Sequence, residues 1–96
     1  MRRSNTQNIN EVVELLLKEM KIDHKLKEVR AINSWNEVMG NNITRATTKI
    51  FIKNRVLFIY LNSAVVRNEL MMLKSGIIKA LNEKAGDRVI EDIVFK

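Results

Sequence analysis

The fold is constrained most by a pair of short segments in the middle of the chain. Both are rich in β-branched and aromatic residues, and only three residues separate them. They are Thr48–Ile52 and Val56–Leu61, separated by Lys53, Asn54 and Arg55. Segments of this composition, joined by so short a connection, predict a β-hairpin. With the turn at Asn54 and Arg55, the register pairs Ile52 with Leu57, Phe51 with Phe58, Ile50 with Ile59 and Lys49 with Tyr60.

This register gives the hairpin two chemically different faces, because successive residues of a strand point to opposite sides. One face is aliphatic and carries Ile50, Ile52, Leu57, Ile59 and Leu61. The other face is aromatic and basic and carries Lys49, Phe51, Lys53, Val56, Phe58 and Tyr60. We expect the aliphatic face to pack on a helix.

Apolar residues at three- and four-residue spacing predict helices on both sides of the hairpin. Before it, one helix is expected from about Ile9 to Met20, and a second from about His24 to Val38 with Gly40 at its end. The second helix places Leu26, Val29 and Ile32 on one side. Asn41–Thr47 fits either a short helical turn or a loop.

After the hairpin, Asn62 or Ser63 is expected to cap a long helix that runs to about Ala85 and ends at Gly86. Its apolar stripe consists of Val66, Leu70, Leu73, Ile77, Ala80 and Leu81. A last strand is expected at Val89–Phe95, with Ile93 and Phe95 on one side and Ile90 and Val94 on the other.

The resulting order α-α-β-β-α-β predicts a small α+β domain in which a three-stranded sheet packs on helices. A chain of 96 residues has room for one core. Residues 1–7 are polar and are expected to fray, so the domain is assigned to residues 8–96. Trp35, with its large apolar area, is expected to anchor that core.

Positive charge is concentrated in one part of the chain. The formal net charge is +6, and residues 45–79 carry seven bases but only one acid, Glu69. A region of one sign attracts nucleic acid or an acidic protein surface, although a solvated basic surface explains the pattern equally well.

The side chains for catalysis are few. The chain has no Cys and one His, His24, for which we favour an exposed position at a helix start. It has no glycine-rich phosphate loop. We therefore expect no enzyme activity, metal, cofactor or small-molecule substrate. The longest apolar run has six residues, too few to span a membrane, and the N-terminus lacks an apolar signal segment. We therefore expect a protein of the cytoplasm, where it can associate with the nucleoid, and no contact with a membrane.

The side chains for binding are better represented. Cations that hold phosphates, together with aromatic rings that stack on bases, are typical of single-strand binding. The candidates are Lys49, Lys53, Arg55, Arg67 and Lys74 for phosphates, with Phe58 and Tyr60 for bases. The alternative, which we favour for Phe51 and Phe58, is that these rings belong to the core. A second candidate surface, for a protein partner, consists of Arg67, Met71, Lys74 and Ile78.

Several motifs together resemble the bacterial DciA family over residues 8–96. They are Trp35–Gly40, Thr47, Leu57–Ser63, Asn68–Leu70, Leu73, Leu81-Asn82, Gly86 and Val89–Phe95. The resemblance implies a K-homology-like fold without the usual two-glycine loop, binding to the replicative DnaB-type helicase, help in loading it, and contact with DNA. Many members carry a long basic extension; this sequence ends at Lys96, and we expect weaker DNA binding without one.

Three functions therefore remain open at the level of sequence. The first is a nucleic-acid-binding accessory of DNA replication, with single-stranded DNA as the favoured ligand. The second is a protein-interaction adaptor that binds the helicase without useful DNA affinity. The third is an RNA-binding module of the K-homology-like kind.

Overall fold

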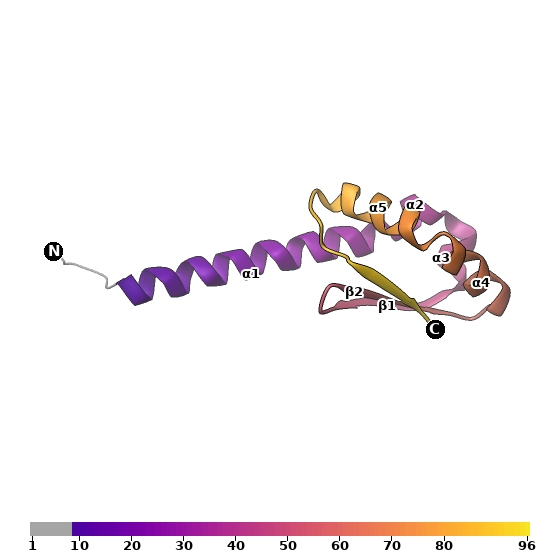
Figure 1. Cartoon of the computed structure of the whole chain (residues 1–96), viewed down its shortest axis with the longest axis horizontal. Helices are drawn as coiled ribbons and strands as arrows, with labels where there is room; N and C mark the ends of the chain where they lie inside the picture. The colour runs from indigo at the N-terminus through magenta and orange to yellow at the C-terminus, as the bar shows by residue number, and fades with distance from the viewer. Residues whose placement is uncertain (1–8) are drawn as a thin grey trace.

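The computed structural model describes residues 9–96, with side chains from Glu11 onward, so the expected fraying of residues 1–7 lies outside the described residues. Helices precede and follow a hairpin, and a last strand completes the sheet (Figure 1). The elements are α1 (Ile9–Asn33), α2 (Trp35–Met39), α3 (Asn41–Ala46), β1 (Thr47–Lys53), β2 (Val56–Leu61), α4 (Ala64–Met72), α5 (Lys74–Ala85) and β3 (Asp92–Phe95). The predicted α+β class is confirmed, and the arrangement is consistent with a K-homology-like fold.

The sheet has the order β1-β2-β3 and is mixed. β1 and β2 are antiparallel, and all four predicted pairs, from Ile52–Leu57 to Lys49–Tyr60, are present. β3 runs parallel to β2 after the crossover through α4 and α5. The two turn residues, Asn54 and Arg55, have φ angles of 53° and 66°, as in the type I′ turn that suits the twist of a hairpin.

The aliphatic face of the hairpin forms the core, as predicted. Leu57, Ile59 and Leu61 are buried. They belong to one cluster with Ala31, Trp35, Leu70, Ile77, Leu81, Ala85, Val89, Ile90 and Ile93. Trp35 is 3% exposed, and its Nε1 donates a hydrogen bond of 3.0 Å to Thr47 Oγ1, so its polar atom is satisfied in the core.

The N-terminal helix is one continuous element, and the expected break at residues 21–23 is wrong. These residues include neither Gly nor Pro. Side-chain contacts at i, i+4 spacing run through this part of the helix: Asp23 forms an ion pair with Lys27 (3.2 Å), and His24 Nε2 lies 3.3 Å from Glu28 Oε2. His24 therefore lies in mid-helix and not at a helix start.

The expected packing side of this region is only partly correct, because Ile32 packs against the core as predicted but the other two residues do not. Leu26 and Val29 are exposed, while Ala31 is fully buried on a different face of α1. The face toward the domain is partly polar: Lys27 pairs with Asp87 at 3.0 Å, and Arg30 Nη1 donates to the Ala85 carbonyl at 3.3 Å. Beside the packing of Ala31 and Ile32, these polar contacts connect α1 to the end of α5 and the loop after it.

The long helix after the hairpin is divided at Leu73. Ser63 caps its start, with Oγ accepting a hydrogen bond from Val66 N, as predicted. Leu73 has φ −106° and ψ 10°, and its amide donates to the carbonyl of Leu70 three residues back. Leu73 is 56% exposed, which corrects its predicted place in the core stripe. Gly86 ends α5 in the left-handed conformation, with φ 81°.

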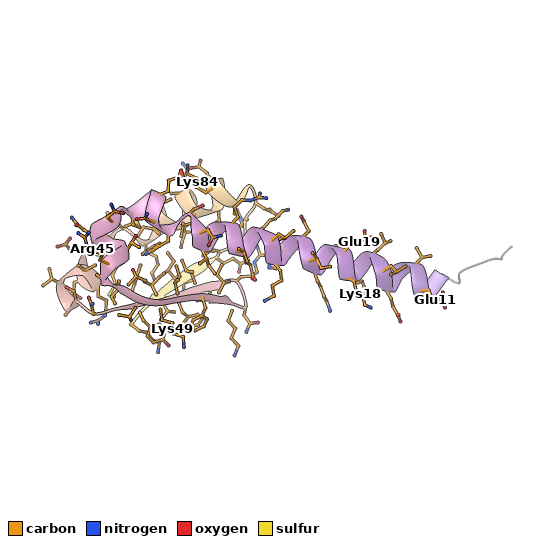
Figure 2. The ribbon with its side chains drawn as sticks, turned by 180° about the vertical axis from the view of Figure 1, so that it is seen from behind. Glu11, Lys18, Glu19, Arg45, Lys49 and Lys84 are labelled. Carbon is orange, nitrogen blue, oxygen red and sulfur yellow. The ribbon has the colours of Figure 1, made fainter. Side chains whose placement is uncertain are left out.

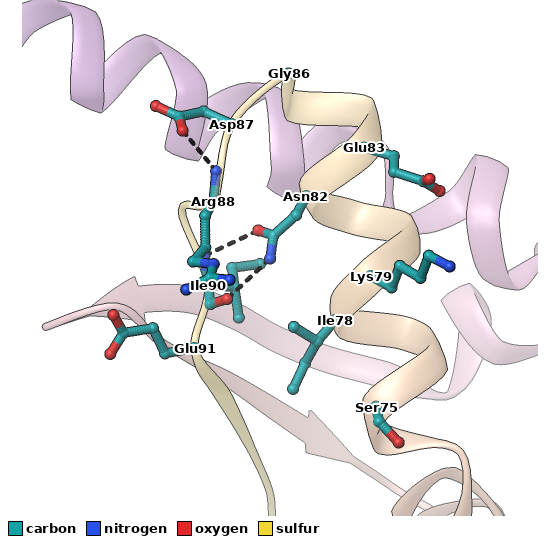
Figure 3. A pocket seen from close by; sticks show the side chains of 10 residues that line it. All are labelled: Ser75, Ile78, Lys79, Asn82, Glu83, Gly86, Asp87, Arg88, Ile90 and Glu91. Carbon is teal, nitrogen blue, oxygen red and sulfur yellow. Dashed lines mark hydrogen bonds between the residues drawn. The ribbon is translucent and has the colours of Figure 1, made fainter.

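The last strand begins at Asp92 and is shorter than predicted, because the side chain of Asn82 forms hydrogen bonds with the backbone of Val89 and Ile90. Asn82 Nδ2 donates to the Ile90 carbonyl (2.9 Å) and its Oδ1 accepts from the Ile90 amide (3.0 Å), as Figure 3 shows for the pocket between α5 and this loop. The same Oδ1 accepts a third hydrogen bond from the amide of Val89 (3.1 Å). Ile90 is consequently buried in the core and does not share a side with Val94.

Candidate nucleic-acid interface

The second face of the hairpin carries a stack of three aromatic rings, which we call the aromatic face: Phe51, Phe58 and Tyr60. The ring centroids of Phe51 and Phe58 are 4.9 Å apart with an interplanar angle of 12°, and those of Phe51 and Tyr60 are 6.1 Å apart at 27°. All three side chains are half-buried. Val94 of β3 extends the same row, because it pairs in register with Phe58.

The expectation that Phe51 and Phe58 belong to the core is wrong. The helices of the described chain lie on the opposite side of the sheet, over the aliphatic face, and leave the aromatic face open (Figure 1). The three rings are partly buried because they stack on one another, although no helix of the described chain covers them.

A cation lies against this stack. Lys49 Nζ is 5.2 Å from the ring centroid of Phe51 and 5.5 Å from that of Tyr60. These distances are in the range of cation–π interactions. Figure 2 shows Lys49 on the side of β1 that faces away from the helices. The site thus combines a positive charge with aromatic surface, the two features that single-stranded nucleic acid requires.

The predicted cations near the hairpin tip differ in their surroundings. Lys53 is exposed, shares the strand face of Lys49, and has no partner among residues 9–96. Arg55 lies with Nε 2.9 Å from Glu91 Oε2, and its Nη2 donates to the Arg88 carbonyl. Arg55 is therefore part of the contact between the turn and the loop before β3.

Arg67 and Lys74 come from the helical layer and are engaged there. Arg67 Nη2 donates to the Leu61 carbonyl at 3.4 Å. Lys74 Nζ lies 3.2 Å from Asp92 Oδ1. The backbone amide of Ile93, followed by the Lys74 ammonium, holds the pKa of Asp92 below its usual value. The structure thus brings Lys49, Lys53, Phe58 and Tyr60 together and places Arg67 and Lys74 elsewhere.

Phe51 is the residue that sequence reasoning left out of the site. It stacks on both Phe58 and Tyr60 and is the centre of the aromatic face. The predicted pairing of Phe51 with Phe58 already carried this information.

The candidate protein-binding surface is split by the helix break. Arg67 and Met71 belong to α4, while Lys74 and Ile78 belong to α5. Ile78 is partly buried against the core, whereas Met71 is 54% exposed. The exposed apolar side chains of this region gather at the α4–α5 junction and are Met71, Met72 and Leu73.

A groove of about 630 Å³ lies between α5 and the loop at residues 86–91 (Figure 3). Ile78 and Asn82 line it, together with the cations Lys79 and Arg88 and the carboxylate of Glu83. The loop backbone orients Asn82, since it takes the side chain's Oδ1 and one of its two N–H groups.

Within the described residues, no three His, Asp or Glu side chains are grouped as metal ligands. No described helix is long and apolar enough to cross a membrane.

Comparison with known proteins identifies the family of the chain. The sequence model of the family described as "Dna[CI] antecedent, DciA" matches residues 8–95. Neither a curated protein sequence nor a solved structure matches the chain. The family match spans nearly all of the described domain, including the hairpin with its aromatic face and the crossover to β3. The chain therefore belongs to the DciA family, whose members take part in loading the DnaB-type helicase in DNA replication.

Proposed function

We propose that this protein is a non-enzymatic accessory of DNA replication that binds single-stranded DNA on its aromatic face and engages the replicative helicase through a separate surface. The observation that carries the DNA-binding part is the open stack of Phe51, Phe58 and Tyr60 with the ammonium of Lys49 against it. Replication and the helicase follow from membership of the DciA family.

Aromatic rings favour single strands over duplexes, because the faces of paired bases are already stacked on their neighbours. A base that stacks on an aromatic side chain contributes about 1–3 kcal/mol. Phe58 and Tyr60 provide such rings at neighbouring positions of β2, and Lys49 and Lys53 provide charges for the adjoining phosphates.

The salt dependence of the binding constant indicates how many cations of the protein contact phosphates. For single strands, the slope of log K against log salt is about −0.7 per neutralised phosphate, so two contacts give about −1.4 and five give about −3.5. Arg55 and Lys74 already face carboxylates, and Arg67 faces a backbone carbonyl. We expect the shallower slope, with Lys49 and Lys53 as the main phosphate contacts.

The test is fluorescence anisotropy with labelled single-stranded DNA, its duplex, and RNA of the same sequence. Tyr60→Ala should weaken single-strand binding about 5- to 150-fold, the equivalent of one lost stacking contact, and duplex binding much less. Lys18→Ala, an exposed cation on α1, is the control and should bind as wild type. Absence of binding at about 50 mM salt contradicts the proposal, since phosphate contacts are strongest there.

RNA of the same sequence separates DNA binding from RNA binding. Stacking and phosphate contacts are common to both ligands, whereas a site that prefers RNA must read the 2′-hydroxyl. None of the aromatic side chains offers a hydrogen-bonding group except Tyr60. We therefore expect similar affinities, and a large preference for RNA would favour the RNA-binding alternative.

A protein-interaction adaptor is the second candidate, and the exposed Met71 at the α4–α5 junction favours it. Met is enriched in the centres of interfaces. Met71→Asp should reduce recovery of the replicative helicase in co-purification, while Glu69→Gln, exposed on the same helix, should not. Wild-type recovery with Met71→Asp excludes this surface. If helicase binding persists and DNA binding is absent, the adaptor is the correct function.

A further inference from the structure

The N-terminal half of α1 extends beyond the domain and leaves apolar side chains without a partner. The molecule measures 64 × 20 × 20 Å, and Figures 1 and 2 show that the long dimension follows α1. The first anchors of the helix on the rest of the fold are Lys27 and Arg30. N-terminal to them, apolar residues are exposed, including Val12, Val13, Leu15, Leu16, Leu17, Met20 and Ile22.

Part of this apolar surface lies opposite the tip of the hairpin. Leu17, Met20 and His24 continue, at three- and four-residue spacing, the helix face whose buried member is Ala31. Together with Ile52, Asn54 and other residues near the turn, they line a groove of about 610 Å³, which we call the tip groove. The groove therefore has one helical wall and one wall made by the hairpin.

The tip groove has an aliphatic floor and a cationic rim. Leu17, Met20 and Ile52 supply the floor. The rim carries the cations Lys21, Lys25, Lys53 and Arg55, together with the imidazole of His24 and the carboxylate of Glu28.

Glu28, the carboxylate of the rim, already contacts two side chains of its own helix. Glu28 lies 3.3 Å from His24 Nε2 and 3.8 Å from Lys25 Nζ. Lys21 and Lys53 have no partner in the part of the chain that the structure describes. Arg55 is paired as well, with Glu91 of the loop before β3. The uncompensated positive charge of the rim therefore comes from Lys21 and Lys53, and an anionic group that approaches the groove meets their free ammonium groups.

We propose that the tip groove binds an acidic amphipathic segment of a partner protein, whose aliphatic side chains cover Leu17 and Met20 and whose carboxylates face the lysines of the rim. Grooves of this kind bind helices through apolar residues at i, i+3, i+4 and i+7 spacing. The charge complementarity selects an acidic occupant over a neutral or basic one.

Two other occupants fit the groove less well. Nucleic acid would find phosphate contacts on the rim, but the floor is aliphatic and the aromatic rings lie on the opposite face of the hairpin. A second copy of this chain would bring a net charge of +6 to a rim that is itself basic.

The test uses a fluorescein-labelled model peptide of 16 residues, with Leu at helical spacing and Glu at the flanking positions, and the same peptide with Lys in place of Glu. Fluorescence anisotropy should show binding of the acidic peptide, weakened by salt, and none of the basic peptide. Failure of the acidic peptide to bind the wild-type protein overturns the proposal.

The chain offers a matched pair of variants for this test. Leu17→Asp should weaken the acidic peptide at least tenfold, because Leu17 lines the groove and is 50% exposed. Leu15→Asp should bind as wild type, because Leu15 is 49% exposed on the same helix but does not line the groove. Equal losses in both variants would overturn the proposal, since the effect would then come from the helix as a whole.

Two further measurements separate the alternatives. If sedimentation equilibrium shows a dimer that Leu17→Asp dissociates, the occupant is a second copy and the proposal is wrong; it is also wrong if Leu17→Asp abolishes DNA binding. The proposal and the DNA-binding function fail independently, because Tyr60→Ala should leave peptide binding unchanged and Leu17→Asp should leave DNA binding unchanged.

Discussion

At the residue scale, single polar side chains decide where elements begin and end. Asn82 makes three hydrogen bonds to the backbone of residues 89 and 90, and these replace the strand pairing that the apolar sequence Val89-Ile90 suggests. A side-chain amide serves this purpose because it offers both a donor and an acceptor. The loop that precedes β3 is thereby fixed against α5, and Val89 and Ile90 are delivered to the core.

Removal of these hydrogen bonds is predicted to destabilise the fold. Asn82→Ala leaves the amide and the carbonyl of Ile90 without these partners, while the Val89 amide keeps its hydrogen bond to the Asp87 carbonyl (3.0 Å). Each group left unpaired costs about 1–3 kcal/mol where water does not reach it. Asn82→Asp keeps the acceptor for both amides and should cost less. The measurement is urea unfolding, with the exposed Asn68→Ala as control. A wild-type midpoint for Asn82→Ala would mean that the loop is held by packing alone.

At the element scale, the glycine inside α5 and the glycine that ends it differ in whether they tolerate a side chain. Gly76 lies inside the helix, and a Cβ at this position would meet no atom within 4 Å. Gly86 ends the helix with φ 81°, a conformation that side chains with a Cβ disfavour. The two positions therefore form a matched pair for substitution by Ala.

Gly76→Ala is predicted to stabilise the protein by about 0.5–1 kcal/mol, because Ala has the higher helix propensity and restricts the unfolded chain. Gly86→Ala should destabilise it by about 1 kcal/mol, since the left-handed conformation is strained for Ala. Thermal unfolding followed by circular dichroism measures both changes. A lower midpoint for Gly76→Ala would show that the junction at Leu73 needs a flexible residue nearby.

The elements also show which parts of the fold the sequence determines. The hairpin was predicted to the register, because alternation and a two-residue turn leave few alternatives. The break at Leu73 was missed, because no Gly or Pro precedes it and the apolar spacing continues through it. The continuity of α1 was missed because Lys21 and Asp23 resemble the polar end of a helix, whereas in the structure Asp23 pairs with Lys27 one turn later in the same helix.

The candidate site was predictable in composition but not in exposure. Lys49, Phe58 and Tyr60 were assigned to one strand face from alternation alone, and the structure keeps them there. Whether that face is covered depends on where the N-terminal helix runs. In this structure, α1 docks through Lys27 and Arg30 and passes over the other side of the sheet, which local patterns do not encode.

At the scale of the whole molecule, ion pairs connect segments that are far apart in the sequence. Lys27–Asp87, Arg55–Glu91, Lys74–Asp92 and Lys84–Glu37 join α1, the hairpin and α2 to α5 and the region around β3. All are exposed or partly exposed, so each contributes little and is weakened by salt. Together they connect the layers that surround the small core.

These ion pairs predict how stability depends on pH. The hydrogen bond from the Lys27 ammonium holds the pKa of Asp87 below its usual value, and the Ile93 amide and Lys74 do the same for Asp92. A lowered pKa in the folded state means that the unfolded state binds protons more readily on acidification. The stabilisation is therefore complete well above 3.8, the ordinary value, and is lost as the pH falls through the lower folded values.

Urea unfolding at pH 7 and at pH 3 measures this loss. The double variant Asp87→Asn and Asp92→Asn should be less stable than wild type at pH 7 and should lose less stability between the two pH values, because two of the responsible carboxyl groups are gone. Glu69→Gln removes an exposed carboxylate without a partner in residues 9–96 and should leave the pH dependence unchanged. An identical loss in the double variant and the wild type would show that the acid sensitivity arises elsewhere.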